Sequence, residues 1–213
     1  MEGRSDEWQK LFIISVVLLC VFLFLGYSYN NLTSIDLWLM KHVWYFRTEW
    51  LTPAMFFITD LGSKYVTLPL MYILVIYFLI KRNPKLSLLI IFNLIGAREM
   101  NKWLKTIYNR TRPNELPLIH ESGLSFPSGH SMNSAAFIGF LGYLLWKHLR
   151  NQGEEAGYIL VLTWMLVGLI GFSRVYLGVH FPSDIVGGFT AGGLWLILTV
   201  MVMKRLNIKV GST

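Results

Sequence analysis

Residues 11–26 read LFIISVVLLCVFLFLG, an apolar run without a charged side chain. A helix that crosses the hydrocarbon core of a bilayer, about 30 Å thick, needs about 20 mainly apolar residues. Further apolar runs follow, and of the 213 residues 54% are hydrophobic and 15% are aromatic. A soluble domain of this length cannot bury so much apolar surface. The bilayer is therefore the expected solvent for most of the chain.

We predict an all-α fold, a polytopic membrane helix bundle with six transmembrane helices that forms a single integral-membrane domain over residues 1–213. Charged or turn-forming residues bound the apolar runs, as at 81–84 and after Met203. The first run has a basic start like that of a signal peptide, but no small-residue cleavage pattern follows it, so we expect it to remain as a span. The expected spans are residues 11–27, 65–80, 86–108, 131–146, 158–174 and 183–203.

Residues 29–63 are expected to form a short amphipathic interfacial segment. They mix Trp38, Trp44 and Trp50 with charged residues such as Asp36 and Arg47. Amphipathic aromatic rings are favoured at the level of the lipid headgroups. We therefore expect this segment to lie along the membrane surface.

The charge distribution predicts an orientation in the cell membrane. Six spans place both termini on one side, together with the loops at 81–85 and 147–155. Those segments carry more Lys and Arg than the opposite loops, so the positive-inside rule makes their side cytoplasmic. The net charge of +7 is not gathered into a continuous basic stripe, and nucleic acid is therefore not an expected partner.

Three polar clusters interrupt the apolar chain, each at the end of an expected span. They are Lys105 with Arg112-Pro113, then Pro127-Ser128-Gly129-His130, then Ser173-Arg174 with His180 and Asp184. Two spans separate the connections that hold them, so topology brings all three to one face, the extracytoplasmic one in this orientation. Charges at membrane depth are costly unless they pair, meet water or bind a ligand. The clusters therefore predict a functional site.

The cations of these clusters favour an anion such as phosphate. Lys105, Arg112 and Arg174 are donors, and a guanidinium matches two phosphate oxygens at once. Ser128 can cap the apolar helix that follows it, while Gly129 lets a ligand approach the free N–H groups of the first turn. This combination predicts a phosphate-binding site.

The two histidines supply the chemistry. His180 and Asp184 are four residues apart, so the carboxylate can orient one ring nitrogen and leave the other free to attack phosphorus. His130 is then the candidate acid for the leaving oxygen. No dense group of acidic residues accompanies the histidines, so we expect neither a metal nor another cofactor.

The motifs Lys105-x6-Arg112-Pro113, Pro127-Ser128-Gly129-His130 and Ser173-Arg174-x5-His180-x3-Asp184 resemble the three-part signature of the type 2 phosphatidic acid phosphatase superfamily. The resemblance covers about residues 60 to 205. It implies that Lys105, Arg112, Ser128, Gly129 and Arg174 bind phosphate, with His130 as acid, His180 as nucleophile and Asp184 as its partner.

By this resemblance the expected function is metal-independent hydrolysis of lipid phosphates through a phosphohistidine, with membrane lipids as the surroundings. Phosphatidylglycerol phosphate, phosphatidic acid and undecaprenyl pyrophosphate are all candidate substrates. Two alternatives stay open: a lipid phosphotransferase with an acceptor other than water, and a non-enzymatic transporter or scaffold.

Supporting roles are expected for Ser173 and Glu99. Arg98 and Glu99 lie two helical turns from Lys105, about 10 Å along an ideal helix. We expect this pair to form ion pairs with polar groups of the bundle and so to support the site, and a direct role in substrate binding stays open as the alternative.

Overall fold

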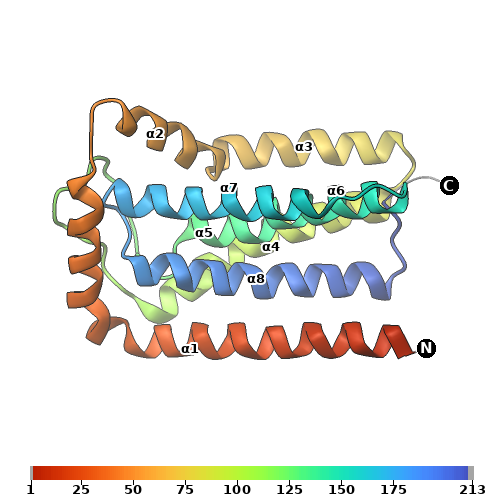
Figure 1. The fold of residues 1–213 in the computed structure, drawn as a ribbon, viewed down its shortest axis with the longest axis horizontal. Coiled ribbons are helices and arrows are strands. Elements are labelled where there is room, and N and C mark those ends of the chain that lie inside the picture. Colours follow the sequence, from red (N-terminus) through yellow and green to blue (C-terminus); the bar gives the residue numbers. More distant parts are fainter. Residues whose placement is uncertain (1, 211–213) are drawn as a thin grey trace.

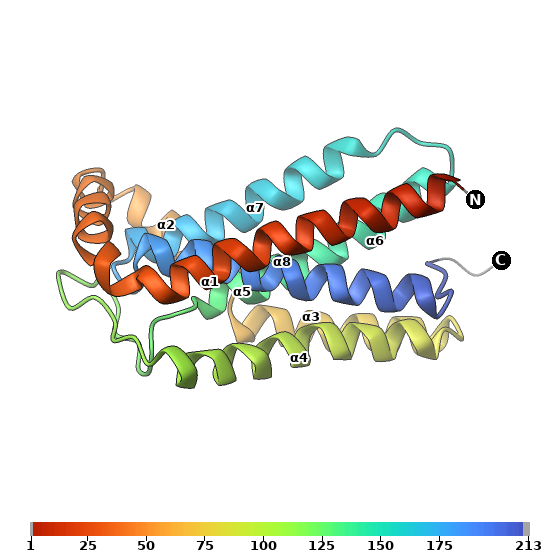
Figure 2. The same ribbon diagram turned by 90° about the horizontal axis from the view of Figure 1, so that it is seen from below.

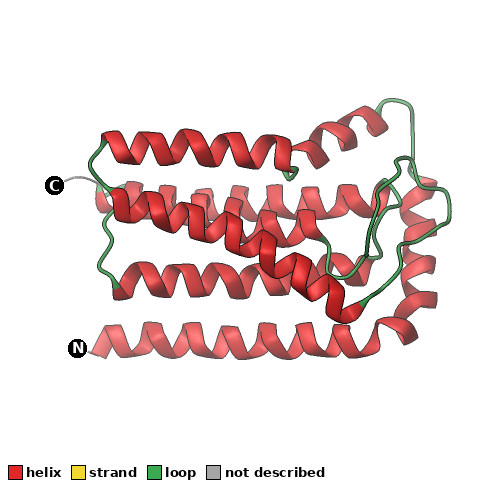
Figure 3. Cartoon of the chain, turned by 180° about the vertical axis from the view of Figure 1, so that it is seen from behind, coloured by secondary structure: helices red, strands yellow, loops and turns green. Residues whose placement is uncertain are grey.

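The computed structural model describes residues 2–210, and every regular element in that range is helical. In chain order the elements are α1 (Glu2–Tyr45), α2 (Leu51–Leu61), α3 (Lys64–Ile80), α4 (Pro84–Tyr108), α5 (Gly129–Asn133), the π-helical η1 (Ser134–Ile138), α6 (Gly139–Asn151), α7 (Gly157–Tyr176) and α8 (Pro182–Arg205). The helices form an elongated bundle in which α1 lies along α8 (Figures 1 and 2). The start of α1 and the end of α8 lie at one end of the bundle, and the long connection between α4 and α5 lies at the other (Figures 1 and 3).

Large apolar side chains cover the outer faces of the bundle. In α1, Phe12 and Phe24 are 69% and 61% exposed, and in α3 Ile73 is 63% exposed. Only 11% of the most apolar window of α1 is buried inside the molecule. Exposed apolar surface of this extent marks contact with a membrane.

The expected number of six spans is not confirmed. By length and composition, α1 over Asp6–Tyr45, α7 and α8 can each cross a membrane, and α2 with α3 forms a fourth candidate bent by 41°. Helix α4 is long enough, but it carries Arg98, Glu99, Lys102 and Lys105. The span expected at 131–146 is divided among α5, η1 and α6.

The segment expected to be interfacial is only partly so. Residues 29–45 complete α1, whose second part turns across the end of the bundle, and α2 follows it (Figure 1). Met40 and Trp44 are buried against Val175 and Phe181, whereas Trp38 remains exposed. The reason is apolar packing: this part of the chain covers the end of α7 and α8 rather than lying only on the membrane surface.

Two glycines on one face of α8 let it approach α5 closely. Gly188 and Gly192 are four residues apart and so share a helix face. A Cβ atom at Gly188 would lie 2.7 Å from the carbonyl oxygen of Ser128, and one at Gly192 would meet the backbone of Met132. The first turn of α5 is therefore held directly on α8.

We predict that Gly188→Ala lowers the stability of the protein in detergent by about 1–3 kcal/mol, because an added methyl group must push two backbones apart. The matched control is Gly168→Ala in α7, where an added Cβ meets nothing within 4 Å. This change should be neutral or slightly stabilising, since alanine favours helix over glycine by about 1 kcal/mol. Thermal unfolding measures both, and equal midpoints would contradict the close contact.

Candidate functional site

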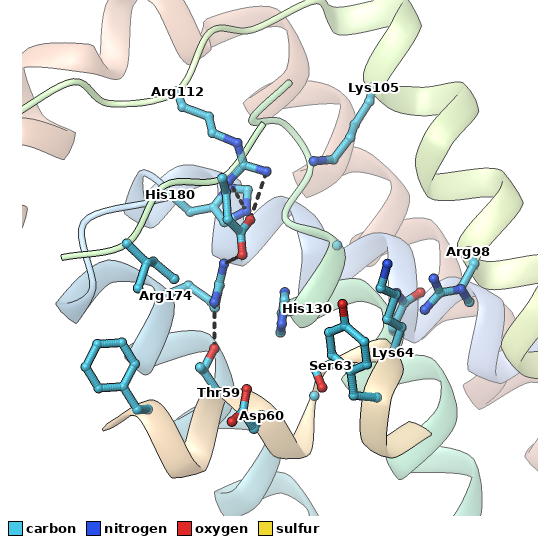
Figure 4. A pocket seen from close by; sticks show the side chains of 17 residues that line it. Thr59, Asp60, Ser63, Lys64, Arg98, Lys105, Arg112, His130, Arg174 and His180 are labelled. Carbon is cyan, nitrogen blue, oxygen red and sulfur yellow. Dashed lines mark hydrogen bonds and ion pairs between the residues drawn. The ribbon is translucent and has the colours of Figure 1, made fainter. Parts of the chain in front are cut away.

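A pocket of about 420 Å³ lies where α2, α3, α4, α5 and α7 meet the connection between α4 and α5. It brings together residues of all three sequence clusters (Figure 4). Those that line it are Lys105, Arg112, Gly129, His130, Arg174 and His180. They come from α4, the α4–α5 connection, α5, α7 and the turn before α8, which the bundle gathers near one end.

His180 is held by Asp184 and Ser125. Asp184 lies in the first turn of α8, where its Oδ2 accepts a hydrogen bond from the backbone N–H of Phe181 at 2.9 Å. The same oxygen lies 3.4 Å from His180 Nδ1 and accepts a 2.5 Å hydrogen bond from Ser125 Oγ. Both His180 and Asp184 are fully buried in protein. The carboxylate therefore fixes one edge of the imidazole.

The other edge of His180 faces the pocket. Its Nε2 lies 3.0 Å from Arg112 Nη1. A guanidinium can only donate, so Nε2 accepts and the ring proton belongs on Nδ1, toward Asp184. Burial, followed by the positive charge of Arg112, lowers the pKa of His180 well below its usual value. The result is a neutral imidazole whose lone pair is available at Nε2, the form that a nucleophile needs.

Asp184 belongs to a buried ion-pair network with Arg110 and Asp36. Arg110 Nη1 donates to Asp184 Oδ1 at 2.7 Å, and Arg110 Nη2 donates to Asp36 Oδ2 at 2.8 Å. Asp36 also accepts from the backbone N–H of Ser183 at 2.9 Å. All three charged side chains are at most 4% exposed. The network ties α1, the α4–α5 connection and α8 together at the site.

We predict that Arg110→Gln destabilises the protein by about 3–5 kcal/mol, because it leaves two buried carboxylates without their cation. The control is Lys102→Gln, which breaks the Lys102–Glu99 pair on the surface, where the side chains are 67% and 61% exposed. An exposed pair of this kind contributes about 0–1 kcal/mol. Unfolding in detergent compares the two, and the network has no structural role if both variants unfold alike.

Glu121 bridges the two arginines of the pocket. Its Oε1 pairs with Arg174, and its Oε2 lies 3.1 Å from Arg112 Nη2. Burial alone would raise the pKa of Glu121, but Arg174 and then Arg112 outweigh it and lower the pKa to about 2. Arg174 also donates to Thr59 Oγ1 at 2.7 Å. An ionised carboxylate thus lies on the cations that the sequence assigns to phosphate.

We predict that Glu121→Gln strengthens the binding of inorganic phosphate about tenfold, because the competing carboxylate is gone while both arginines keep their charge. Isothermal titration calorimetry measures this without any assumption about turnover. The control is Glu115→Gln, which makes the same change in the same connection at a carboxylate that pairs instead with Lys41 on the surface. Weaker phosphate binding in Glu121→Gln would show that the carboxylate supports the anion site instead of competing for it.

Other residues singled out in the sequence lie outside the pocket lining. Ser128 caps α5, where its Oγ accepts from the N–H of Ser131 at 3.5 Å, and its own N–H donates to the carbonyl oxygen of Asp184 at 3.0 Å. Ser173 Oγ donates to the carbonyl oxygen of Ile170. Glu99 lies on the surface and pairs with Lys102, so it makes no contact inside the bundle of the kind expected, whereas Arg98 lines the pocket.

Three charged side chains that form ion pairs in or beside the site are not identified from the sequence. Asp36 belongs to the segment interpreted as interfacial, Arg110 lies between Lys105 and Arg112 without an assigned role, and Glu121 lies in a connection without a motif. The signal that could have found them is charge balance, since buried arginines need acids nearby. Within residues 2–210, no three His, Cys, Asp or Glu side chains converge as ligands for a metal.

The bundle and its pocket define an all-helical membrane protein with a pocket lined by several cationic side chains. The chain belongs to the PAP2 superfamily, whose family model matches residues 85–208. It is 37% identical over 187 residues to phosphatidylglycerophosphatase B of Bacillus subtilis, which covers 87% of this chain and 91% of that protein. The chain also superposes on a crystal structure from Bacillus subtilis, that of a transmembrane PAP2 type phosphatidylglycerolphosphate phosphatase. The TM-score is 0.84 at 36% identity, over 90% of this chain and 96% of that one.

A more distant relative is the undecaprenyl-diphosphatase of Sulfolobus acidocaldarius, which is 24% identical over 97% of this chain and 96% of its own length. These relatives are named as phosphatases that act on lipid phosphates. The chain is accordingly an enzyme of the lipid phosphate phosphatase class.

Proposed function

We propose that this enzyme removes the terminal phosphate of a lipid head group through a covalent phosphohistidine at His180, without a metal ion. The observation that carries the proposal is the orientation of His180, whose Nδ1 faces Asp184 and whose Nε2 faces Arg112 in the pocket. The names of the relatives favour phosphatidylglycerol phosphate, with undecaprenyl pyrophosphate as the other candidate substrate.

The first half-reaction forms a bond from His180 Nε2 to phosphorus and breaks the bond from phosphorus to the alcohol oxygen. His130, which lines the same pocket, gives its proton to the departing oxygen. Asp184 stabilises the positive charge that develops on the His180 ring. Lys105, Arg112 and Arg174 stabilise the charge on the equatorial oxygens of the phosphoryl group, which is the main contribution that a protein makes to this reaction.

The second half-reaction uses water. His130 takes a proton from the water as its oxygen attacks phosphorus, and the bond from phosphorus to Nε2 breaks. Inorganic phosphate leaves, and His180 returns to its neutral form. Both steps require Glu121 to release Arg112 Nη2 and Arg174 Nη2 to the substrate phosphate, because the N–H groups that hold the carboxylate cannot donate to phosphate oxygens at the same time.

We also propose that the single domain crosses the membrane six times, with α4 and the α5–η1–α6 stretch as the two further spans, and that the site lies on the extracytoplasmic side. The basic residues Lys81, Arg82, Lys147 and Arg150 support this orientation, since they lie in or beside the loops at the end of the bundle opposite to the site. The length of α4, 25 residues, is sufficient for a span.

Phosphate release by the purified protein in detergent with EDTA tests the proposed chemistry. The panel contains phosphatidylglycerol phosphate, phosphatidic acid and undecaprenyl pyrophosphate, and His180→Ala should reduce release to the background rate with each. The control is His148→Ala, the same change at an exposed histidine near the end of α6. Release by His180→Ala at the wild-type rate would exclude a phosphohistidine at this residue.

His130→Ala should slow the hydrolysis of phosphatidic acid by about 10²–10⁴-fold, the usual contribution of a general acid. The loss should be smaller with undecaprenyl pyrophosphate, because its leaving group is a phosphate monoester that needs less protonation. Equal losses on both substrates would contradict the acid role.

A further inference from the structure

The pocket holds a second pair of cations, Lys64 and Arg98, that the proposed reaction does not use. In Figure 4 they lie on one side of the pocket and Arg112 and His180 on the other, with His130 between them. Among the described residues neither cation forms an ion pair or a hydrogen bond, and the ring of Tyr65 lies 5.2 Å from Lys64 Nζ. Asp60 also lines the pocket, but among these residues it is not paired with either cation, and unpaired cations favour an anionic ligand.

An ordinary membrane anchor does not explain the pair. Long basic side chains near the ends of spans extend to the headgroup region. Arg98 is instead in the interior of α4 and is partly buried. Lys64 is exposed, but it begins α3 at the junction with α2, which lies between the two ends of the bundle (Figure 1). Both cations therefore face the pocket within the length of the bundle.

The start of α3 adds further donors at the same place. The first N–H groups of a helix lack partners within the helix, and the helix dipole favours an anion there. Ser63 precedes this turn, is only 8% exposed, and its Oγ has no hydrogen-bond partner among the described residues. The hydroxyl of Ser63 can therefore donate to a ligand oxygen, beside the two cations.

The spacing along α4 separates this pair from the catalytic cations. Arg98 and Lys105 are seven residues apart, so they lie on nearly the same face of the helix and about 10 Å apart along its axis. Arg98 is the one nearer to the middle of the bundle. A lipid with its acyl chains in the bilayer and its terminal phosphate at His180 has any other head-group phosphate on this inner side.

We propose that Lys64, Arg98 and Ser63 bind a second phosphate of the substrate and so select lipids with two spaced phosphates. The substrate class is a lipid that carries a terminal phosphate monoester and, across a glycerol, a phosphodiester. Two helical turns fit that spacing, whereas the phosphates of a pyrophosphate share one oxygen and both lie near the first group of cations. This inference rests on the proposed function, because it assumes that the terminal phosphate lies at His180.

The test compares phosphatidylglycerol phosphate with phosphatidic acid of the same acyl chains, using Arg98→Gln, Lys64→Gln and the wild type. Each variant should lower the ratio of kcat/KM between the two substrates about tenfold, because one charge-assisted contact to the phosphodiester is lost. Lys102→Gln, which removes a charge of α4 outside the pocket, should leave the ratio unchanged. A parallel loss on both substrates, or an unchanged ratio, overturns the inference.

Undecaprenyl pyrophosphate should behave like phosphatidic acid in these variants. If its kcat/KM falls with that of phosphatidylglycerol phosphate while phosphatidic acid is unaffected, the assignment to spaced phosphates is wrong.

A binding measurement separates this inference from the proposed function. Glycerol 1,3-bisphosphate should bind the wild type more tightly than glycerol 1-phosphate in calorimetry, and Arg98→Gln should abolish the difference. Equal binding of both probes by the wild type overturns the inference. Failure of the wild type to release phosphate from any lipid would instead contradict the proposed function and leave the calorimetric result valid.

Discussion

The site depends on one constraint: a charge inside an apolar bundle must have a partner. Arg110 has two such partners, because it pairs with Asp36 and Asp184 at the same time. These three side chains join α1, the connection after α4 and the start of α8. The desolvation of each charge is costly, so the arrangement is stable only as a complete set. Because Asp184 also holds His180, the orientation of the proposed nucleophile follows from a network that lies outside the pocket lining.

The same constraint shapes the pocket. Arg112 and Arg174 are held close together by the fold, and their mutual repulsion is relieved by Glu121. In the proposed reaction the substrate phosphate replaces a carboxylate that already lies on both guanidinium groups. The free energy of phosphate binding is then the difference between the interactions that the two anions make with the arginines. This difference favours a phosphate dianion with three free oxygens over a singly charged carboxylate. Phosphate product can also leave, because Glu121 is available to replace it.

The sequence predicted the parts of the site that are local. His180 and Asp184 lie four residues apart, and the cations end helices on one face, so spacing and topology were sufficient to bring them together. Charge balance indicates that acids lie near the arginines, but it does not single out Asp36 and Glu121, because an acid that balances a charge can come from any part of the chain. The segment around Met40 was interpreted as interfacial from its aromatic residues, yet the same apolar character serves to cover α7. Only three or four of the six expected spans are clear candidates. One that is missing is α4, because its charged residues Arg98 and Lys105, which line the pocket, interrupt its apolar sequence.

The bend between α2 and α3 connects these features. A straight helix would satisfy its backbone internally through this region, whereas the break at Gly62 leaves the first turn of α3 open toward the pocket. The break also needs a glycine, because a Cβ atom there would lie 2.6 Å from Ile170 and 2.9 Å from Ser134 Oγ. Thr59, one turn before the break, accepts from Arg174, and Lys64, just after it, faces the same pocket. A discontinuity in a candidate membrane span thus supplies polar contacts where a regular helix offers only side chains, as expected where irregular backbone lines a cavity.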